Sequence, residues 1–231
     1  MYTYFTILLL SLAGPLGLSF DKKVHFYTRW KPMFLSMILP AIFYCVWDSI
    51  FASMQIWFFN KEYITGLYIH NLPIEEVLFF FVIPYCCVFV YECVCVYFPK
   101  LQSTKKADYI IYAIGIFALA VGIYYRLLWY TASTGIFLGI FIAIFFSCRK
   151  YFSSFNSTAF LVAYIIIQIP FLVVNGFLTS IPVITYNNTE NLATRIFTIP
   201  LEDTFYGMLH IMMVIIGYEK LLKRGVEPLR R

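Results

Sequence analysis

Charged residues are scarce in this chain, since Asp, Glu, Lys and Arg together make up 13% of it, whereas hydrophobic residues make up 61%. A soluble domain carries about 25% charged residues, so this composition excludes an ordinary soluble fold. Ten-residue stretches of alternating polar and apolar residues are also missing, which argues against a transmembrane β-barrel. The apolar residues run in long continuous stretches instead. Helices are therefore the expected way for this chain to cross a bilayer.

Motifs for redox cofactors and for structural metals are missing as well. The sequence has no G-x-G-x-x-G, and none of its six cysteines forms a C-x-x-C pair. The first absence argues against a dinucleotide-binding domain, and the second against a metal site or a disulfide framework. We interpret the cysteines as packing residues and expect neither a cofactor nor a metal. No basic stripe interleaved with aromatics is present, so nucleic acid is not an expected partner.

Seven apolar segments are long enough, or nearly so, to span a membrane, which takes roughly 20 apolar residues per helix. They are Tyr2–Ser19, Phe34–Phe58, Ile74–Phe98, Tyr109–Arg126, Trp129–Cys148, Thr158–Ile181 and Asp203–Leu222. Prolines inside the second, third and sixth segments are tolerated in membrane helices and usually mark kinks. The sequence therefore predicts an all-α integral membrane protein with seven transmembrane helices.

Lysine and arginine are divided unevenly between the two sets of connecting segments. One set holds Lys22, Lys23, Arg29, Lys31, Lys100, Lys105, Lys106, Arg149, Lys150, Lys220, Lys223, Arg224, Arg230 and Arg231, and the other holds Lys61, Arg126 and Arg195. Because positive loops face the cytoplasm, this asymmetry predicts an N-terminus outside and a C-terminus in the cytoplasm. The net charge of +5 then reflects membrane topology. A signal peptide at Met1–Ser19 is disfavoured, because no positive n-region precedes its apolar run.

The chain also carries an internal repeat, which becomes visible when it is shifted by 127 residues so that Pro73 falls on Pro200. Further matches at this offset are Glu75 with Glu202, Glu76 with Asp203, Phe79 with Tyr206, Tyr91-Glu92 with Tyr218-Glu219, Asp48 with Asn175, Ser53 with Ser180, Asn60 with Asn187 and Lys22-Lys23 with Arg149-Lys150. We predict two three-helix repeats, residues 1–98 and 128–231, joined by residues 99–127 with the fourth helix. That helix restores the chain direction, so the repeats run parallel in a 3+1+3 arrangement.

Ionisable side chains inside membrane segments are costly and therefore are candidates for function. Apart from Arg126 and Lys220 at the ends of their segments, no lysine or arginine lies within the expected spans to neutralise them. The candidates are Asp48, Glu75, Glu76, Glu202, Asp203 and His210, accompanied by the uncharged Asn175. The simpler interpretation is that Pro-x-Glu marks a helix start, where proline and an acid are both favourable. It explains one carboxylate per motif, but neither the second nor Asp48 in the middle of its segment.

A protonated carboxylic acid beside an ionised one is suited to general acid–base catalysis. Asp203, Tyr206 and His210 share one helix face and could form a proton relay, although a lone buried histidine satisfied by a neighbour is an equally good interpretation. Aromatic residues make up 21% of the chain, and some are expected to line a site near the acids. We name Tyr44, Trp47, Phe79 and Tyr206. Since aromatic rings stabilise cations, the combination suits a carbocation reaction on a hydrocarbon substrate. For Glu92 and Glu219, near the cytoplasmic lysines, interfacial ion pairing is expected.

The two motifs, Pro73-Ile74-Glu75-Glu76 and Pro200-Leu201-Glu202-Asp203, in a seven-helix double repeat resemble those of the small membrane carotenoid cyclases. This family comprises the heterodimeric-type lycopene cyclases of bacteria and their fused forms in archaea, bacteria and fungi. The resemblance covers nearly the whole chain. It implies catalytic roles for Glu75, Glu76, Glu202 and Asp203. It does not extend to Asp48, Asn175 or His210, which are supporting candidates from position alone.

The resemblance implies a lycopene β-cyclase of carotenoid biosynthesis, located in a bacterial inner membrane. A carboxylic acid would protonate the terminal double bond of a ψ-end, the C5=C6 bond would attack the carbocation, and a base would remove a ring proton. The product would be β-carotene, formed through γ-carotene without oxidation or reduction and without a cofactor. Lycopene and the bilayer are the implied partners. Whether the ring is β or ε, whether one or both ends close, and the oligomeric state stay open.

Other classes of membrane protein share parts of this pattern. Small sugar transporters use a parallel 3+1+3 layout, but they need polar groups along a midplane path, and few polar groups reach the centre here. A retinal-binding protein would need a lysine in the middle of the seventh helix, whereas Lys220 and Lys223 lie at its end. A small transporter and a non-catalytic membrane subunit are the alternatives that stay open.

Overall fold

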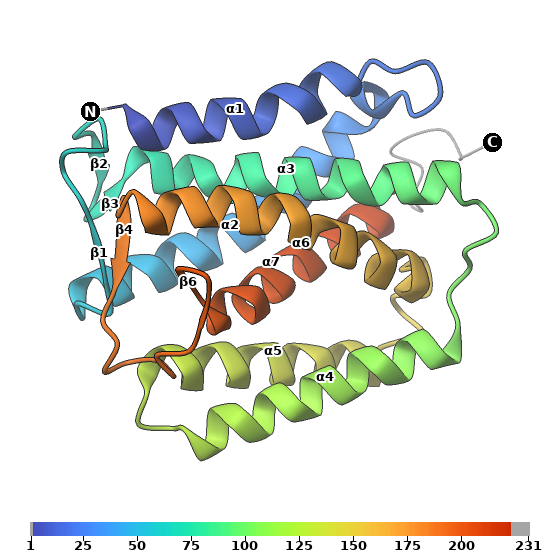
Figure 1. The fold of residues 1–231 in the computed structure, drawn as a ribbon. Helices are drawn as coiled ribbons and strands as arrows, with labels where there is room; N and C mark the ends of the chain where they lie inside the picture. Colours follow the sequence, from blue (N-terminus) through green and yellow to red (C-terminus); the bar gives the residue numbers. More distant parts are fainter. Residues whose placement is uncertain (1, 223–231) are drawn as a thin grey trace.

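The computed structural model describes residues 2–222, which form seven α-helices, one 3₁₀-helix and six short strands (Figure 1). The helices are α1 (Thr3–Leu18), η1 (Phe26–Arg29), α2 (Trp30–Ser53), α3 (Ile74–Tyr97), α4 (Lys105–Tyr124), α5 (Trp129–Ser147), α6 (Ser157–Ser180) and α7 (Leu201–Leu221). The strands are β1 (Trp57–Phe59), β2 (Tyr68–Ile69), β3 (Leu72–Pro73), β4 (Ile184–Tyr186), β5 (Arg195–Ile196) and β6 (Ile199–Pro200). Lys223, Arg224, Arg230 and Arg231, which contributed to the predicted orientation, lie outside the described residues.

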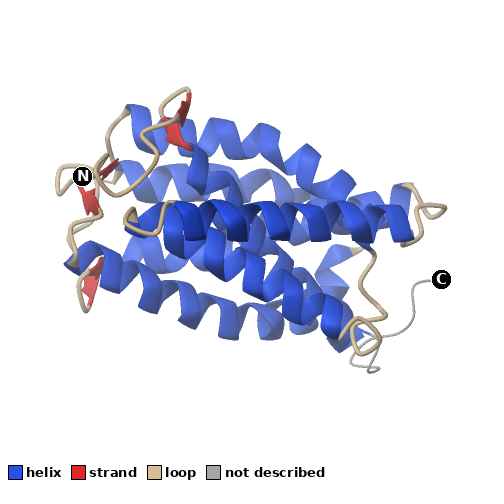
Figure 2. Ribbon diagram, turned by 90° about the horizontal axis from the view of Figure 1, so that it is seen from below, coloured by secondary structure: helices blue, strands red, loops and turns tan. Residues whose placement is uncertain are grey.

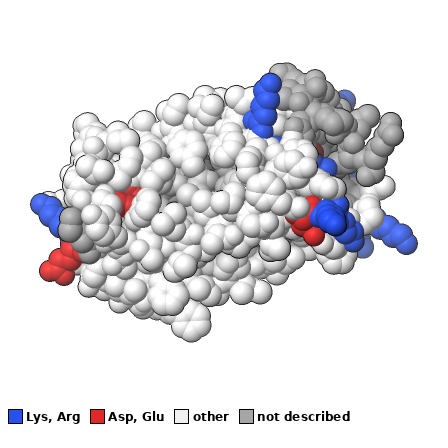
Figure 3. Space-filling view, turned by 90° about the horizontal axis from the view of Figure 1, so that it is seen from above, with Lys and Arg blue, Asp and Glu red and all other residues white. Residues whose placement is uncertain are grey.

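Five helices in this part of the chain are long and apolar enough to cross a membrane. They are Phe26–Ser53, in which η1 and α2 are continuous, and α3, α4, α5 and α6. Helix α1 is apolar but shorter, and α7 is not among the five. On the face seen in Figure 3, charged side chains gather at the two ends of the molecule, and the surface between the ends is almost free of them. The prediction of seven membrane crossings therefore stays a prediction for α1 and α7.

The second apolar segment ends earlier as a helix than the sequence predicted. Helix α2 stops at Ser53, and Gln55 adopts a left-handed backbone with a φ of 59°. The apolar run then continues as β1, which pairs with β4. The predicted helix over Phe34–Phe58 is therefore wrong at its C-terminal end, because long-range strand pairing takes the last apolar residues. Asp48 consequently lies in the last two turns of α2 and not in its middle.

The internal repeat is visible in the backbone at one end of the bundle, where all the strands lie (Figure 2). Strands β1 and β4 are equivalent under the 127-residue offset and pair with each other in antiparallel register, with Phe58 opposite its own counterpart Thr185. A strand pair of this kind has a local twofold axis. The hairpins β2–β3 and β5–β6 are likewise copies, and their turn residues His70 and Phe197 both have a φ of 58°.

At the opposite ends of α3 and α7, two hydrogen bonds cross between the repeats. The Tyr91 hydroxyl donates to Glu219 at 2.7 Å, and its counterpart Tyr218 donates to Glu92 at 2.8 Å. Glu92 also forms an ion pair with Arg29. The expected ion pairing of Glu92 is therefore confirmed, but with an arginine and in a buried position. These contacts join α3 and α7, the two helices that begin with the motif acids.

Helix α4 packs closely against α5 and lies at the edge of the bundle (Figure 1). Glycines allow this close approach, which is a common device between membrane helices. A Cβ atom on Gly135 would lie 2.3 Å from the carbonyl oxygen of Ala118, and one on Gly122 would lie 2.9 Å from backbone atoms of α5. Helix α5 in turn packs against α7, and Tyr130 near its start donates to Asp203 of α7.

Candidate active site

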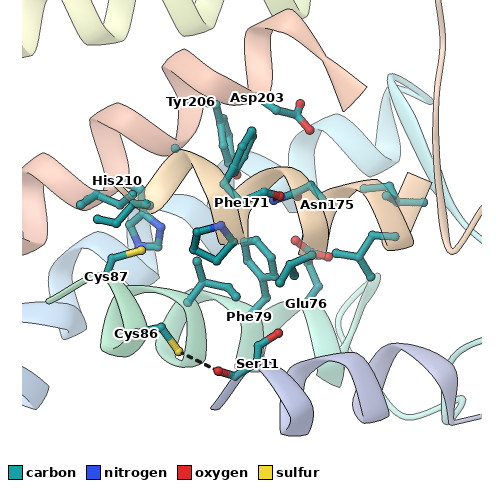
Figure 4. Close-up of a pocket in the computed structure, with 18 of the residues that line it drawn as sticks. Ser11, Glu76, Phe79, Cys86, Cys87, Phe171, Asn175, Asp203, Tyr206 and His210 are labelled. Atoms are coloured by element: carbon teal, nitrogen blue, oxygen red, sulfur yellow. Dashed lines mark hydrogen bonds between the residues drawn. The ribbon is translucent and has the colours of Figure 1, made fainter. Parts of the chain in front are cut away.

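A cavity of about 230 Å³ lies between the two repeats. Its walls come from α1, α2, α3, α5, α6 and α7 and from strands β1 and β4, and they are largely apolar and aromatic. Three acidic side chains, Asp48, Glu76 and Asp203, line it. In Figure 4, Glu76 on α3 and Asp203 on α7 extend toward the cavity from opposite sides, with Asn175 between them. The structure thus brings one acid of each motif to a shared space.

The second acid of the first motif, Glu76, is held by a chain of polar contacts. The Tyr4 hydroxyl of α1 donates to Glu76 Oε2 at 2.6 Å. The carboxyl group of Asp48 lies within hydrogen-bonding reach of Glu76. Asp48 Oδ1 in turn accepts a hydrogen bond of 2.5 Å from the Tyr206 hydroxyl of α7. The four side chains of this network therefore join α1, α2 and α3 of the first repeat to α7 of the second.

The second acid of the second motif, Asp203, is held differently. Its Oδ1 accepts a hydrogen bond of 2.5 Å from Tyr130, and its Oδ2 accepts one of 2.9 Å from Tyr186. Desolvation in the cavity wall and the neighbouring Asp203 carboxyl raise the pKa of the Tyr186 hydroxyl above its usual value, so Tyr186 stays a proton donor. Both oxygens of Asp203 thus act as acceptors.

The first acid of each motif, Glu75 or Glu202, holds the loop in front of its helix. Glu75 Oε1 accepts a hydrogen bond of 2.6 Å from the backbone N–H of Thr65. Glu202 Oε1 accepts one of 2.8 Å from the N–H of Leu192, the counterpart of Thr65 under the repeat. The Thr131 hydroxyl adds a further bond of 2.5 Å to Glu202. Neither glutamate lines the shared cavity.

The supporting candidates are also at the cavity, but they are not joined in the predicted way. His210 stacks on Tyr44 with ring centroids 4.3 Å apart, and its buried Nε2 has no hydrogen-bond partner in the described part of the chain. Tyr206 donates to Asp48, and Asp203 accepts from other tyrosines. The predicted relay through Asp203, Tyr206 and His210 is therefore not formed by direct hydrogen bonds.

The aromatic residues expected near the acids divide into two groups. Phe79 and Tyr206 line the cavity, whereas Tyr44 and Trp47 pack behind Tyr206, with ring centroids 4.7 and 5.0 Å from its own. Asn175 lines the cavity from α6, and its Nδ2 donates to the carbonyl of Phe171 at 3.3 Å. In residues 2–222, no three His, Cys, Asp or Glu side chains are grouped so that they could hold a metal ion.

Three tyrosines at the acids were missed by the sequence analysis. Tyr4 and Tyr130 occupy equivalent places, because each donates to the second acid of its own repeat. Their offset is one residue shorter than that of the motifs, so a search at a fixed offset of 127 pairs Tyr4 with Thr131 instead. Allowing a one-residue gap between the first helix and the motif of each repeat would have found them. Tyr186 has no such signal, since its counterpart is Phe59.

The fold and the cavity define a class of protein: a helical membrane protein whose two equivalent halves together enclose an apolar, acid-bearing site. The family model described as lycopene cyclase matches two segments of the chain, residues 1–94 and 125–221. The chain therefore belongs to the lycopene cyclase family, and the resemblance inferred from the two motifs is confirmed. Comparisons with curated proteins and with solved structures gave no significant match. Family membership makes the chain an integral membrane protein of carotenoid biosynthesis with a cyclase function.

Proposed function

We propose that the chain is a lycopene β-cyclase that closes the ψ-ends of lycopene by acid–base chemistry, giving β-carotene through γ-carotene. The observation that carries this proposal is the shared cavity, where Glu76, Asp48 and Asp203 meet in otherwise apolar and aromatic surroundings. Carboxyl groups supply both functions that the reaction needs, a proton donor and a proton acceptor. Membership of the lycopene cyclase family supports a carotenoid as the substrate.

The reaction is a balanced isomerisation in which one proton enters and one leaves. A carboxylic acid adds a proton to the terminal double bond and creates a tertiary carbocation. The electron pair of the C5=C6 bond then forms the ring bond, and a carboxylate removes a ring proton. Ring faces of Trp57, Phe79 and Tyr206 on the cavity wall stabilise the cationic intermediates. The apolar walls exclude water, which would otherwise capture the cation.

The volume of the cavity supports binding of one end of the substrate at a time. Sites that enclose a whole drug-sized ligand have volumes of about 300–1,000 Å³, and the cavity of about 230 Å³ is smaller. A cyclisable end group fits such a space, while the rest of a long polyene must leave it. Ser11 and Pro15 of α1 and Pro170 and Phe171 of α6 line the cavity and are themselves partly exposed on the surface of the molecule. We propose that the polyene leaves there.

The topology that accompanies this function is the 3+1+3 arrangement with seven crossings, with residues 1–98 and 128–231 as repeats and 99–127 as the linker. The equivalence of β1 with β4 and of the two hairpins supports it, as do the two segments matched by the family model. We propose that the strand-bearing end faces outward and that the C-terminus is cytoplasmic, in a bacterial inner membrane. The lysine and arginine asymmetry supports this orientation.

Co-expression with the genes for lycopene synthesis in a heterologous host tests the proposed function. We expect the cells to change from red to yellow-orange as lycopene is converted, and chromatography of the extracted pigment should identify β-rings. A product with ε-rings would contradict the β-cyclase assignment. Unchanged lycopene in cells whose membranes contain the protein would contradict cyclisation altogether.

A further inference from the structure

The two halves of the site are equivalent in backbone but differ in several side chains, four of which bear on the acids. Asp48, which reaches Glu76 in the first repeat, is replaced by Asn175 in the second. The other three differences are Glu76 with Asp203, Phe59 with Tyr186 and Tyr68 with Arg195. The first repeat thus brings two carboxyl groups together. The second surrounds one carboxyl group with hydroxyl donors and a cation.

We propose that the two repeats divide the proton transfers: Glu76, paired with Asp48, delivers the proton, and Asp203, held by Tyr130 and Tyr186, receives it. This assignment rests on the proposed function and adds the direction of proton flow through the site. Asp48 is a positioning residue in this scheme, because it acts on the substrate through Glu76.

The contacts of the first repeat favour a carboxylic acid that carries a proton. Two carboxyl groups at hydrogen-bonding reach repel each other when both are ionised, and they share a proton when they are close. The hydroxyls of Tyr206 and Tyr4 already donate to one oxygen each of Asp48 and Glu76. Within residues 2–222, no lysine or arginine forms an ion pair with Asp48 or Glu76. The pair therefore holds a proton that Glu76 can release into the cavity.

The contacts of the second repeat favour an ionised carboxylate. A carboxylate is an acceptor only, and both oxygens of Asp203 accept hydrogen bonds from tyrosine hydroxyls. The Arg195 guanidinium lies 5.4 Å from the centroid of the Tyr186 ring, so a cation stands beside one of the tyrosines that donate to Asp203. Its Nη2 donates to Asn188, and its Nη1 is buried without a hydrogen-bond partner in the described structure.

The steps balance under this assignment. The O–H bond of Glu76 breaks as a C–H bond forms at the CH carbon of the terminal double bond. The C5=C6 electron pair then forms the ring bond, and the C6–H bond breaks to form the ring double bond. That last proton goes to a carboxylate oxygen of Asp203. Each ring leaves Glu76 deprotonated and Asp203 protonated, so one proton returns to Glu76 before the next ring closes.

Deuterium labelling of the purified protein in lipid vesicles separates the two roles. In D₂O, the wild-type protein should form rings that carry one deuterium each. Glu76→Gln should lose ring formation by about 10²–10⁴-fold and return unlabelled lycopene, because the residue that delivers the first proton is gone. Asp203→Asn should lose ring formation by about 10²–10⁴-fold. It should return lycopene that carries deuterium, because Glu76 still delivers a deuteron to the terminal double bond and the cation can lose a proton from the same carbon to give lycopene again. Mass spectrometry of the recovered pigment measures the deuterium content of lycopene and of the cyclic product, and chromatography measures the amount of each.

Tyr186→Phe provides a second variant that keeps the aromatic ring and removes one hydroxyl from Asp203. This variant should form less cyclic product than the wild-type protein, and its ratio of labelled lycopene to cyclic product should be higher. Labelled lycopene from Glu76→Gln but not from Asp203→Asn would overturn the assignment, as would unlabelled lycopene from both variants. Absence of rings from the wild-type protein would instead contradict the proposed function, so the two failures are distinguishable.

Discussion

Glu76→Gln is expected to lower the conversion of lycopene by about 10²–10⁴-fold, whereas Glu75→Gln, one residue earlier, should stay close to wild type. Glutamine keeps the size of Glu76 and can still accept the hydrogen bond from Tyr4, but it cannot give up a proton as a carboxylic acid does. At position 75 the amide oxygen can still accept from the N–H of Thr65, which is the contact that the structure assigns to this side chain. Conversion per amount of membrane-inserted protein is the measurement.

Glu75→Ala is the matched structural control for this pair. It leaves the Thr65 N–H without its acceptor, which typically costs about 1–3 kcal/mol when the group is buried. We therefore expect a lower thermal stability in detergent for Glu75→Ala and an unchanged one for Glu75→Gln. Equal loss of conversion in Glu75→Gln and Glu76→Gln, or full conversion by Glu76→Gln, would contradict the separation of the two acids.

Filling the cavity from Gly207 should abolish conversion without unfolding the protein. Gly207 on α7 lines the cavity, and a Cβ atom built on it meets nothing within 4 Å. Gly207→Ala should retain conversion and stabilise the helix by up to about 1 kcal/mol, since alanine is the better helix former. Gly207→Phe places a ring where the end group of the substrate is proposed to bind, so we expect loss of conversion.

Gly14→Phe is the control for the added bulk. Gly14 lies on α1, a Cβ on it also meets nothing within 4 Å, and it does not line the cavity. This variant should convert lycopene like the wild type. Thermal stability and pigment conversion are measured on all four proteins. Wild-type conversion by a folded Gly207→Phe variant would contradict the cavity as the site of reaction.

Much of the fold could be predicted from the sequence, because apolar runs, prolines and the repeat are local signals. The start of α3 at Ile74 was predicted to the residue, and α7 begins two residues before the predicted Asp203. The end of α2 was not predictable from local hydrophobicity. Trp57 to Phe59 are as apolar as the helix before them, and they become a strand only because β4, far away in the sequence, is there to pair with.

The acids of the candidate site could be predicted from the sequence, but which of them faces the cavity could not. Adjacent residues on an α-helix point about 100° apart, so Glu75 and Glu76 cannot both face one cavity. Which of them faces it depends on how α3 is rotated against its neighbours, and that rotation is set by tertiary packing. The contacts of Asp48 with Glu76 and Tyr206 also join three helices, so no single segment contains the signal.

The most direct test of the central claim uses the purified wild-type protein in lipid vesicles with lycopene as the sole added reactant. If proton transfers at the shared cavity close the rings, then lycopene should disappear and cyclic carotene of the same molecular mass should appear. Lycopene that persists in the presence of folded protein, or a product whose mass differs from that of lycopene, would contradict the account.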